Sequence, residues 1–110
     1  MKTIAIALLA LLLLASAPAN ATLLGVFKEP GIACLSKKDL TDAYAFLRAG
    51  DRAGHRTFSV SQLRSGRCLI VPQGTRVFID NVGWDGLNAF RVIGTQQPLF
   101  IEREYLQVQP

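Results

Sequence analysis

Few side chains of this chain have the types and spacing that catalysis requires. A hydrolase or transferase usually combines a nucleophile with a general base, and that base is most often a histidine. His55 is the only histidine, and it lies between Gly54 and Arg56 in a polar stretch of the sequence. We therefore expect His55 to be a surface side chain, and we predict no catalytic residue.

Two pairs of carboxylates offer another route to acid–base chemistry, of the kind that glycosidases use. Asp80 and Asp85 flank one loop, while Glu102 and Glu104 are two residues apart, a spacing that places both on one face of a strand. The second pair is also typical of the solvated edge of a small sheet. A small carboxylate-dependent hydrolase is therefore an alternative interpretation.

Residues 80–86 have the composition of a calcium-binding loop but lack its ligands. Val82 and Trp84 stand where such a loop needs oxygen atoms. The net charge of +4, from 12 Lys and Arg against 8 Asp and Glu, is below that of a dedicated nucleic-acid binder. We therefore predict no metal, no cofactor and no nucleic-acid partner.

Trp84 is the only tryptophan, and it lies between two glycines and beside Asp85. Tryptophan is enriched at binding hot spots because it combines a large apolar area with one N–H donor. Trp84 either folds back as a lid or core residue, the more frequent outcome, or is exposed for binding. In the second case we expect a contact surface over residues 81–87, supported by Arg76 and Arg91 on solvent-facing positions of adjacent strands.

The N-terminal residues have the parts of a secretory signal peptide. Lys2 supplies the positive region, residues 4–15 form an unbroken apolar run, and Ala19 and Ala21 form the small-x-small pattern of a cleavage site. The apolar run is shorter than the roughly 20 residues that span a bilayer. We therefore expect a periplasmic or secreted protein that begins at Thr22 and has no stable membrane insertion.

Cys34 and Cys68 are the only cysteines. An even pair in an exported chain predicts one structural disulfide. The pair does not have the Cys-x-x-Cys spacing of a redox site, and no histidine lies close by in the sequence to complete a metal site. On the chain-entropy argument, this bridge would stabilise the fold by roughly 3 to 4 kcal/mol.

Residues 22–66 have a helical pattern after a short lead-in over residues 22–32. Ser36 is suited to cap a helix over residues 37–49, and Asp51 is suited to cap a second helix. The first helix carries one apolar stripe at helical spacing, formed by Leu40, Ala43, Tyr44 and Leu47.

From residue 68 onward the pattern changes to short strands separated by turns. The strands are expected over residues 68–71, 76–80, 88–93 and 99–102.

The order of these strands carries a family resemblance. Residues 74–79 begin with a Gly-x-x-Val pattern, residues 90–93 contain Phe-Arg-Val, and residues 99–101 precede a closing turn that ends at Leu106. In this order the second half resembles a bacterial SH3-like domain over about residues 69–108. The resemblance implies a small antiparallel barrel.

We therefore predict an α+β fold for a single small domain over residues 22–110. An N-terminal helical segment of one or two helices, residues 22–66, is linked by the disulfide to a small antiparallel SH3-like sheet or barrel, residues 67–108. The apolar stripe of the first helix is expected to pack on Ile70, Val77, Ile79, Phe90, Val92 and Phe100.

These observations favour a non-catalytic binding protein of a bacterial periplasm or exterior, whose partner is a protein or a cell-wall component. A second interpretation, besides the hydrolase, is a structural accessory subunit of a surface assembly. In that case the strands over residues 68–71 and 99–101 would offer edges for pairing.

The mature protein is expected to begin at Thr22, because Ala19 and Ala21 fit the small-residue pocket of signal peptidase. Intact-mass measurement of exported material tests this expectation. A mass that retains residues 1–21 would contradict it and indicate an uncleaved anchor.

Overall fold

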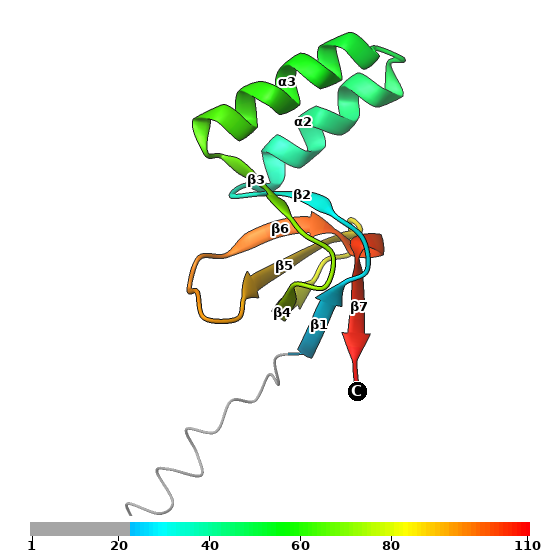
Figure 1. Ribbon diagram of the computed structural model, residues 1–110. Helices are drawn as coiled ribbons and strands as arrows, with labels where there is room; N and C mark the ends of the chain where they lie inside the picture. Colours follow the sequence, from blue (N-terminus) through cyan, green and yellow to red (C-terminus); the bar gives the residue numbers. More distant parts are fainter. Residues whose placement is uncertain (1–22) are drawn as a thin grey trace, which may run out of the picture.

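The computed structural model describes residues 23–110 of the chain (Figure 1). The predicted signal peptide and Thr22 lie outside the described residues. Within the described part of the chain, no helix is long and apolar enough to cross a membrane.

Two helices stand side by side as a hairpin on one side of a curved sheet (Figure 1). Within residues 23–110 these are α2, Lys37–Arg48, and α3, Arg52–Ser65. Ser36 and Asp51 cap them, because each side chain accepts a backbone N–H of the first turn. α3 ends at Gly66, whose φ of 78° lies in the left-handed region. Both helices are therefore confirmed, together with the capping residues that predicted them.

The described residues also form seven strands in one antiparallel sheet. The strands are β1 (Leu23–Phe27), β2 (Gly31–Cys34), β3 (Cys68–Val71), β4 (Arg76–Val82), β5 (Leu87–Val92), β6 (Leu99–Glu102) and β7 (Leu106–Gln109). Their order across the sheet is β3-β2-β6-β5-β4-β1-β7. A short 3-10 helix, η1 (Arg103–Tyr105), joins β6 to β7.

The predicted fold class, with a helical segment ahead of a small SH3-like sheet, is wrong. β1 and β2 precede the helices and belong to the same sheet as the later strands. The helical hairpin is therefore an insertion between β2 and β3, and residue 66 does not separate a helical part from a β part. The prediction failed because residues 22–32 lack an alternating pattern and their strand partners are remote in sequence. β1 pairs with β4 and β7, and β2 pairs with β3 and β6.

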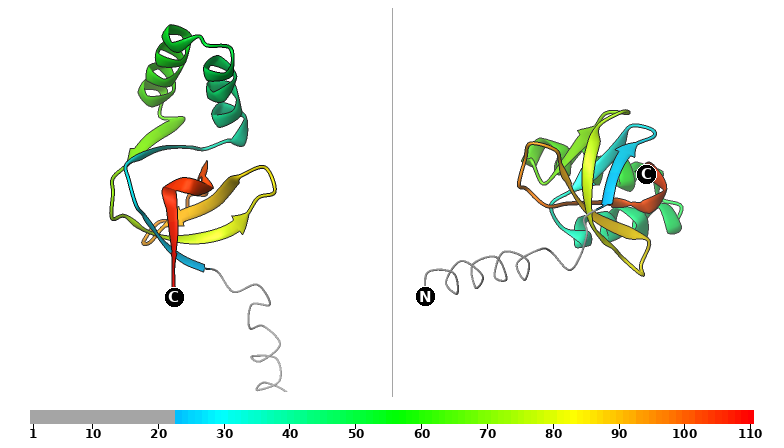
Figure 2. Two further views of the ribbon diagram at one scale, coloured as in Figure 1. Left: turned by 90° about the vertical axis from the view of Figure 1, so that its right-hand side faces the viewer. Right: turned by 90° about the horizontal axis from the view of Figure 1, so that it is seen from below.

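The short link between β1 and β2 requires the sheet to curve. Phe27 ends β1 and Gly31 begins β2, so the connecting chain spans at most about 14 Å. β1 and β2 are four strand spacings apart in the sheet order, which would be about 19 Å in a flat sheet. The sheet therefore wraps around its own interior, as the two views of Figure 2 show.

The interior of the curved sheet is filled by two packed phenylalanine rings and the aliphatic residues around them. Phe27 and Phe90 meet edge to face, with ring centroids 5.3 Å apart. The residues that surround them are Ala33, Val71, Val77, Ile79, Leu99, Ile101 and Leu106. Because strands enclose this core, its residues are not available to a helix from outside.

The predicted packing of the helix stripe is therefore wrong for Val77, Ile79, Phe90 and Val92, whereas Phe100 does pack against the cluster that contains Leu40. Leu40 is the buried residue of α2, and it belongs to a separate cluster with Cys34, Cys68 and Leu87. Leu47, at the far end of the stripe, is 45% exposed. The helices thus contact the sheet mainly around the two cysteines.

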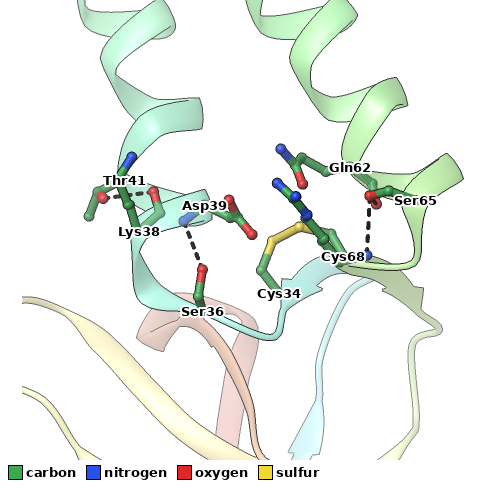
Figure 3. The surroundings of a disulfide bond; sticks show 9 residues. Cys34, Ser36, Lys38, Asp39, Thr41, Gln62, Ser65 and Cys68 are labelled. Carbon is green, nitrogen blue, oxygen red and sulfur yellow. Dashed lines mark hydrogen bonds between the residues drawn. A yellow bond between two sulfur atoms is a disulfide. The ribbon is translucent and has the colours of Figure 1, made fainter.

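The predicted disulfide between Cys34 and Cys68 is confirmed. The two residues are register partners at the end of the β2–β3 pair, with Cα atoms 4.0 Å apart. The bridge lies at the base of the helical hairpin, next to the first turn of α2 and the last turns of α3 (Figure 3). It closes a loop that contains both helices, and it fits an oxidising compartment outside the cytoplasm.

Replacing both cysteines, as Cys34→Ser with Cys68→Ser, should lower the free energy of unfolding by about 3 to 4 kcal/mol. The cause is the larger conformational entropy of the unfolded chain once its loop of 34 residues is no longer closed. Urea denaturation of the oxidised protein and of the double variant measures the difference. A reductant should shift the midpoint of the parent protein but not that of the variant. Equal midpoints for the oxidised parent and the variant would contradict a stabilising role.

Candidate functional site

Trp84 lies in a tight turn between β4 and β5 that backbone hydrogen bonds hold together. The N–H of Gly83 donates to the Leu87 carbonyl at 3.0 Å, and the N–H of Gly86 donates to the Gly83 carbonyl at 3.4 Å. The carboxylate of Asp85 accepts the Leu87 N–H at 3.1 Å. The turn therefore has one well-defined shape that does not depend on its tryptophan.

The two glycines of this turn are needed for its geometry. A Cβ on Gly83 would overlap the Asp85 carboxylate and the Leu87 carbonyl. Gly86 has a φ of 83°, which is costly for other residues. Both glycines thus allow the turn to close tightly beneath the indole.

The indole of Trp84 is fully exposed, at 103% of its reference area. The alternative in which Trp84 folds back as a lid or core residue is therefore not the one that the structure adopts. Val82, at the end of β4, is also 47% exposed, so an apolar side chain accompanies the indole near the turn. An exposed tryptophan is the side-chain type most enriched at binding hot spots.

Asp85 connects the turn to the helical hairpin. Its carboxylate lies 3.3 Å from the ammonium of Lys37, which is in the first turn of α2. The Leu87 N–H and then Lys37 hold the pKa of the Asp85 carboxyl below its ordinary value. No sequence pattern indicates Lys37 as a partner of Asp85, because the two residues are 48 positions apart along the chain.

The two arginines expected beside Trp84 lie elsewhere. Arg91 faces Asp80 across the β4–β5 pair with two hydrogen bonds, of 2.7 and 2.8 Å, and stacks over Phe78. Arg76 begins β4, so six residues, or about 20 Å of strand, separate it from Val82 at the turn. The predicted surface of Trp84, Asp85, Arg76 and Arg91 is therefore not assembled as one patch.

Neither predicted carboxylate pair is assembled. Asp80 pairs with Arg91, whereas Asp85 pairs with Lys37. β6 ends at Glu102 and the chain turns into η1, so Glu102 and Glu104 do not lie on one strand face. Within residues 23–110, no three His, Cys, Asp or Glu side chains gather in a way that could hold a metal ion.

A cavity of about 390 Å³ lies between the helical hairpin and the end of the sheet. Its apolar lining includes Ile32, Leu40, Ala43, Tyr44, Phe58 and Tyr105, beside the disulfide. Its polar lining consists of Asp39, His55, Ser59, Gln62 and Glu102. His55 lines this cavity and is half-buried, so it is less exposed than its polar stretch of sequence suggested.

Gln62 is the unusual polar residue of the cavity. It is 7% exposed, and its carbonyl Oε1 has no hydrogen-bond partner among the described residues. Its side chain and that of Asp39 extend into the space between the two helices, next to the disulfide (Figure 3). The spacing of His55, Ser59 and Gln62, at i, i+4 and i+7, places the three polar residues on one face of α3. That spacing is the signal by which the sequence could have revealed this polar stripe.

Two tyrosines and a carboxylate meet at the sheet side of the cavity. Burial and then the neighbouring Glu102 raise the pKa of Tyr44 far above its ordinary 10.0. The same two causes raise the pKa of Tyr105. Both hydroxyls therefore stay protonated as the pH rises to alkaline values.

Comparisons of this chain with protein-family models, with curated proteins and with solved structures found no match.

The folded protein should resist ionisation of its tyrosines at a pH near 10, where tyrosine in an unfolded chain titrates. Above that pH the unfolded state releases protons that the folded state retains, so the free energy of unfolding should fall as the pH rises. Ultraviolet difference absorbance and urea denaturation at several pH values measure both effects.

Tyr44→Phe should make this alkaline loss of stability less steep, while Tyr105 continues to contribute. An equally steep loss in the variant would show that Tyr44 does not have the raised pKa.

Proposed function

We propose that this chain is an exported, non-catalytic binding protein of a bacterial periplasm or exterior, and that the Trp84 turn is its contact site. The partner is a protein or a cell-wall component. Support for export comes from the leader-like N-terminal sequence and from the disulfide, which fits an oxidising compartment.

The single observation that carries this proposal is the complete exposure of Trp84 on a turn of fixed shape. An indole that packs on nothing contributes little to the stability of the fold. Covering it with a partner removes a large apolar area from water, which favours association.

The hydrogen bonds of the turn reduce the cost of binding. A loop that becomes ordered only on association loses conformational entropy at that step. Here the Gly83 and Leu87 backbones and the Asp85 carboxylate already fix the turn. The ion pair from Asp85 to Lys37 adds a link to α2, which places the helical hairpin beside the contact site.

A structural accessory subunit is a second candidate, which one feature of the sheet supports. β3 is an edge strand, and its Ile70 is 60% exposed. Such an edge is suited to pairing with a strand of another chain. The other edge expected from sequence, β6, lies between β2 and β5 inside the sheet and is not available.

Trp84→Ala should weaken capture of the partner by about 2 kcal/mol or more, which is roughly thirtyfold in Kd. The thermal midpoint should change little, because the indole makes no packing contact in the fold. The measurement is affinity capture from periplasmic extract and on purified cell wall, followed by titration of the partner that is retained.

Val60→Ala is the matched control, because it removes an exposed apolar side chain from α3 rather than from the turn. It should leave capture unchanged. Capture that survives Trp84→Ala at full strength would remove the turn from the contact site, and a large drop in thermal midpoint would place the indole in the folding core.

A further inference from the structure

The cavity under the helical hairpin is built differently from the core inside the sheet. Its volume of about 390 Å³ is within the range of small-molecule sites. Its lining follows both helices, from Leu40 and Gln62 beside the disulfide to Leu47 and His55 toward the other end of the hairpin. The hairpin itself stands on the end of the sheet (Figure 1). The cavity is also distinct from the Trp84 turn, so its function does not depend on that contact site.

The walls of the cavity are suited to a flat or branched apolar body. Tyr44 and Phe58 come from the two helices, and Tyr105 comes from η1 on the sheet side. Leu40 and the disulfide form the floor next to the sheet. Aromatic faces also attract cations, because their π-systems carry partial negative charge.

The cavity holds an unpaired acceptor and two carboxylates beside the hydroxyl groups of Tyr44, Ser59 and Tyr105. Gln62 presents a buried Oε1 that lacks a donor among the described residues, and Asp39 and Glu102 add two carboxylates. In the described part of the chain neither carboxylate forms an ion pair with Lys or Arg. Within the same residues no lysine or arginine lines the cavity, and His55 is the one lining side chain that can carry positive charge.

The unpaired Gln62 oxygen and the two carboxylates together favour a ligand that is positively charged and can donate a hydrogen bond. A buried acceptor without a donor is unfavourable, and an N–H group of a ligand relieves it. Two carboxylates attract a cation and repel an anion. A purely apolar ligand would leave Gln62 without a donor, and an acid would face both carboxylates.

We propose that the cavity binds a small amphipathic amine, with its apolar body between Tyr44 and Phe58 and its ammonium group directed at Gln62, Asp39 and Glu102. The ammonium donates to the Gln62 Oε1 and is balanced by the two carboxylates. The protein is then a binder of small cationic ligands as well as a partner of larger molecules.

Three probes with the same phenyl body and different head groups test the proposal. These are 2-phenylethylamine, 2-phenylethanol and phenylacetate, titrated into the oxidised protein while amide chemical shifts are followed by NMR. A pH of about 8 keeps the amine of the probe charged. The amine should shift residues that line the cavity and should bind about tenfold or more tightly than the alcohol, with phenylacetate weaker still.

Gln62→Leu removes the acceptor and keeps an apolar side chain of similar reach. It should weaken binding of the amine by about tenfold, leave the alcohol unaffected, and leave the thermal midpoint equal or higher, because a buried unpaired group is lost. Glu102→Gln should also weaken binding of the amine. Gln73→Leu, at an exposed glutamine of the β3–β4 turn, is the matched control and should change nothing.

Three results would overturn the proposal. The first is equal binding of the amine and the alcohol, which would reduce the cavity to an apolar site. The second is tighter binding of phenylacetate. The third is an absence of shifts at the lining residues with all three probes.

Discussion

The Cys34–Cys68 disulfide is the constraint on which the position of the helical hairpin depends. The chain leaves the sheet after Cys34, forms both helices, and returns at Cys68 to the neighbouring strand. The sulfur atoms also form the centre of the cluster in which Leu40 meets the sheet. Because the hairpin is fixed at this point, Lys37 reaches Asp85 and Gln62 faces the cavity. The bridge therefore fixes the walls of the cavity and the link from α2 to the Trp84 turn, whereas the turn itself is held by its own hydrogen bonds.

The local parts of the fold were predictable from sequence, whereas the long-range parts were not. Ser36, Asp51 and Gly66 act within one helical turn of their own positions, so their types were sufficient to predict two helices. β1 has no such signal. Its Gly25 sits where a Cβ would press on Ile79, a requirement set by a strand more than 50 residues away. Strand pairing at that separation cannot be derived from a local pattern, and the predicted order of helices and sheet was wrong for this reason.

For the candidate sites as well, the type of a residue could be read from the sequence, but its surroundings could not. Sequence singled out Trp84 by its type and its flanking glycines, but only the structure distinguishes a lid from an exposed side chain. Arg76 and Arg91 were placed correctly on outward positions of strands, yet distance along β4 and the Asp80 carboxylate separate them from the turn. The burial of Gln62 could not be predicted in this way, because a polar residue in a helix is ordinarily solvated and its burial here follows from the position of the neighbouring helix.

The point at which the hairpin joins the sheet has a consequence for how such a chain can change. β2 and β3 are hydrogen-bonded neighbours, and their last partners, Cys34 and Cys68, have Cα atoms 4.0 Å apart. That separation is one that a tight turn could also close. In the sheet, the whole helical hairpin thus takes the place of the turn that would ordinarily connect two neighbouring antiparallel strands. Helices of another length, or with other side chains facing the cavity, can therefore connect β2 to β3 without any change in strand register. The hairpin can vary while the sheet stays the same.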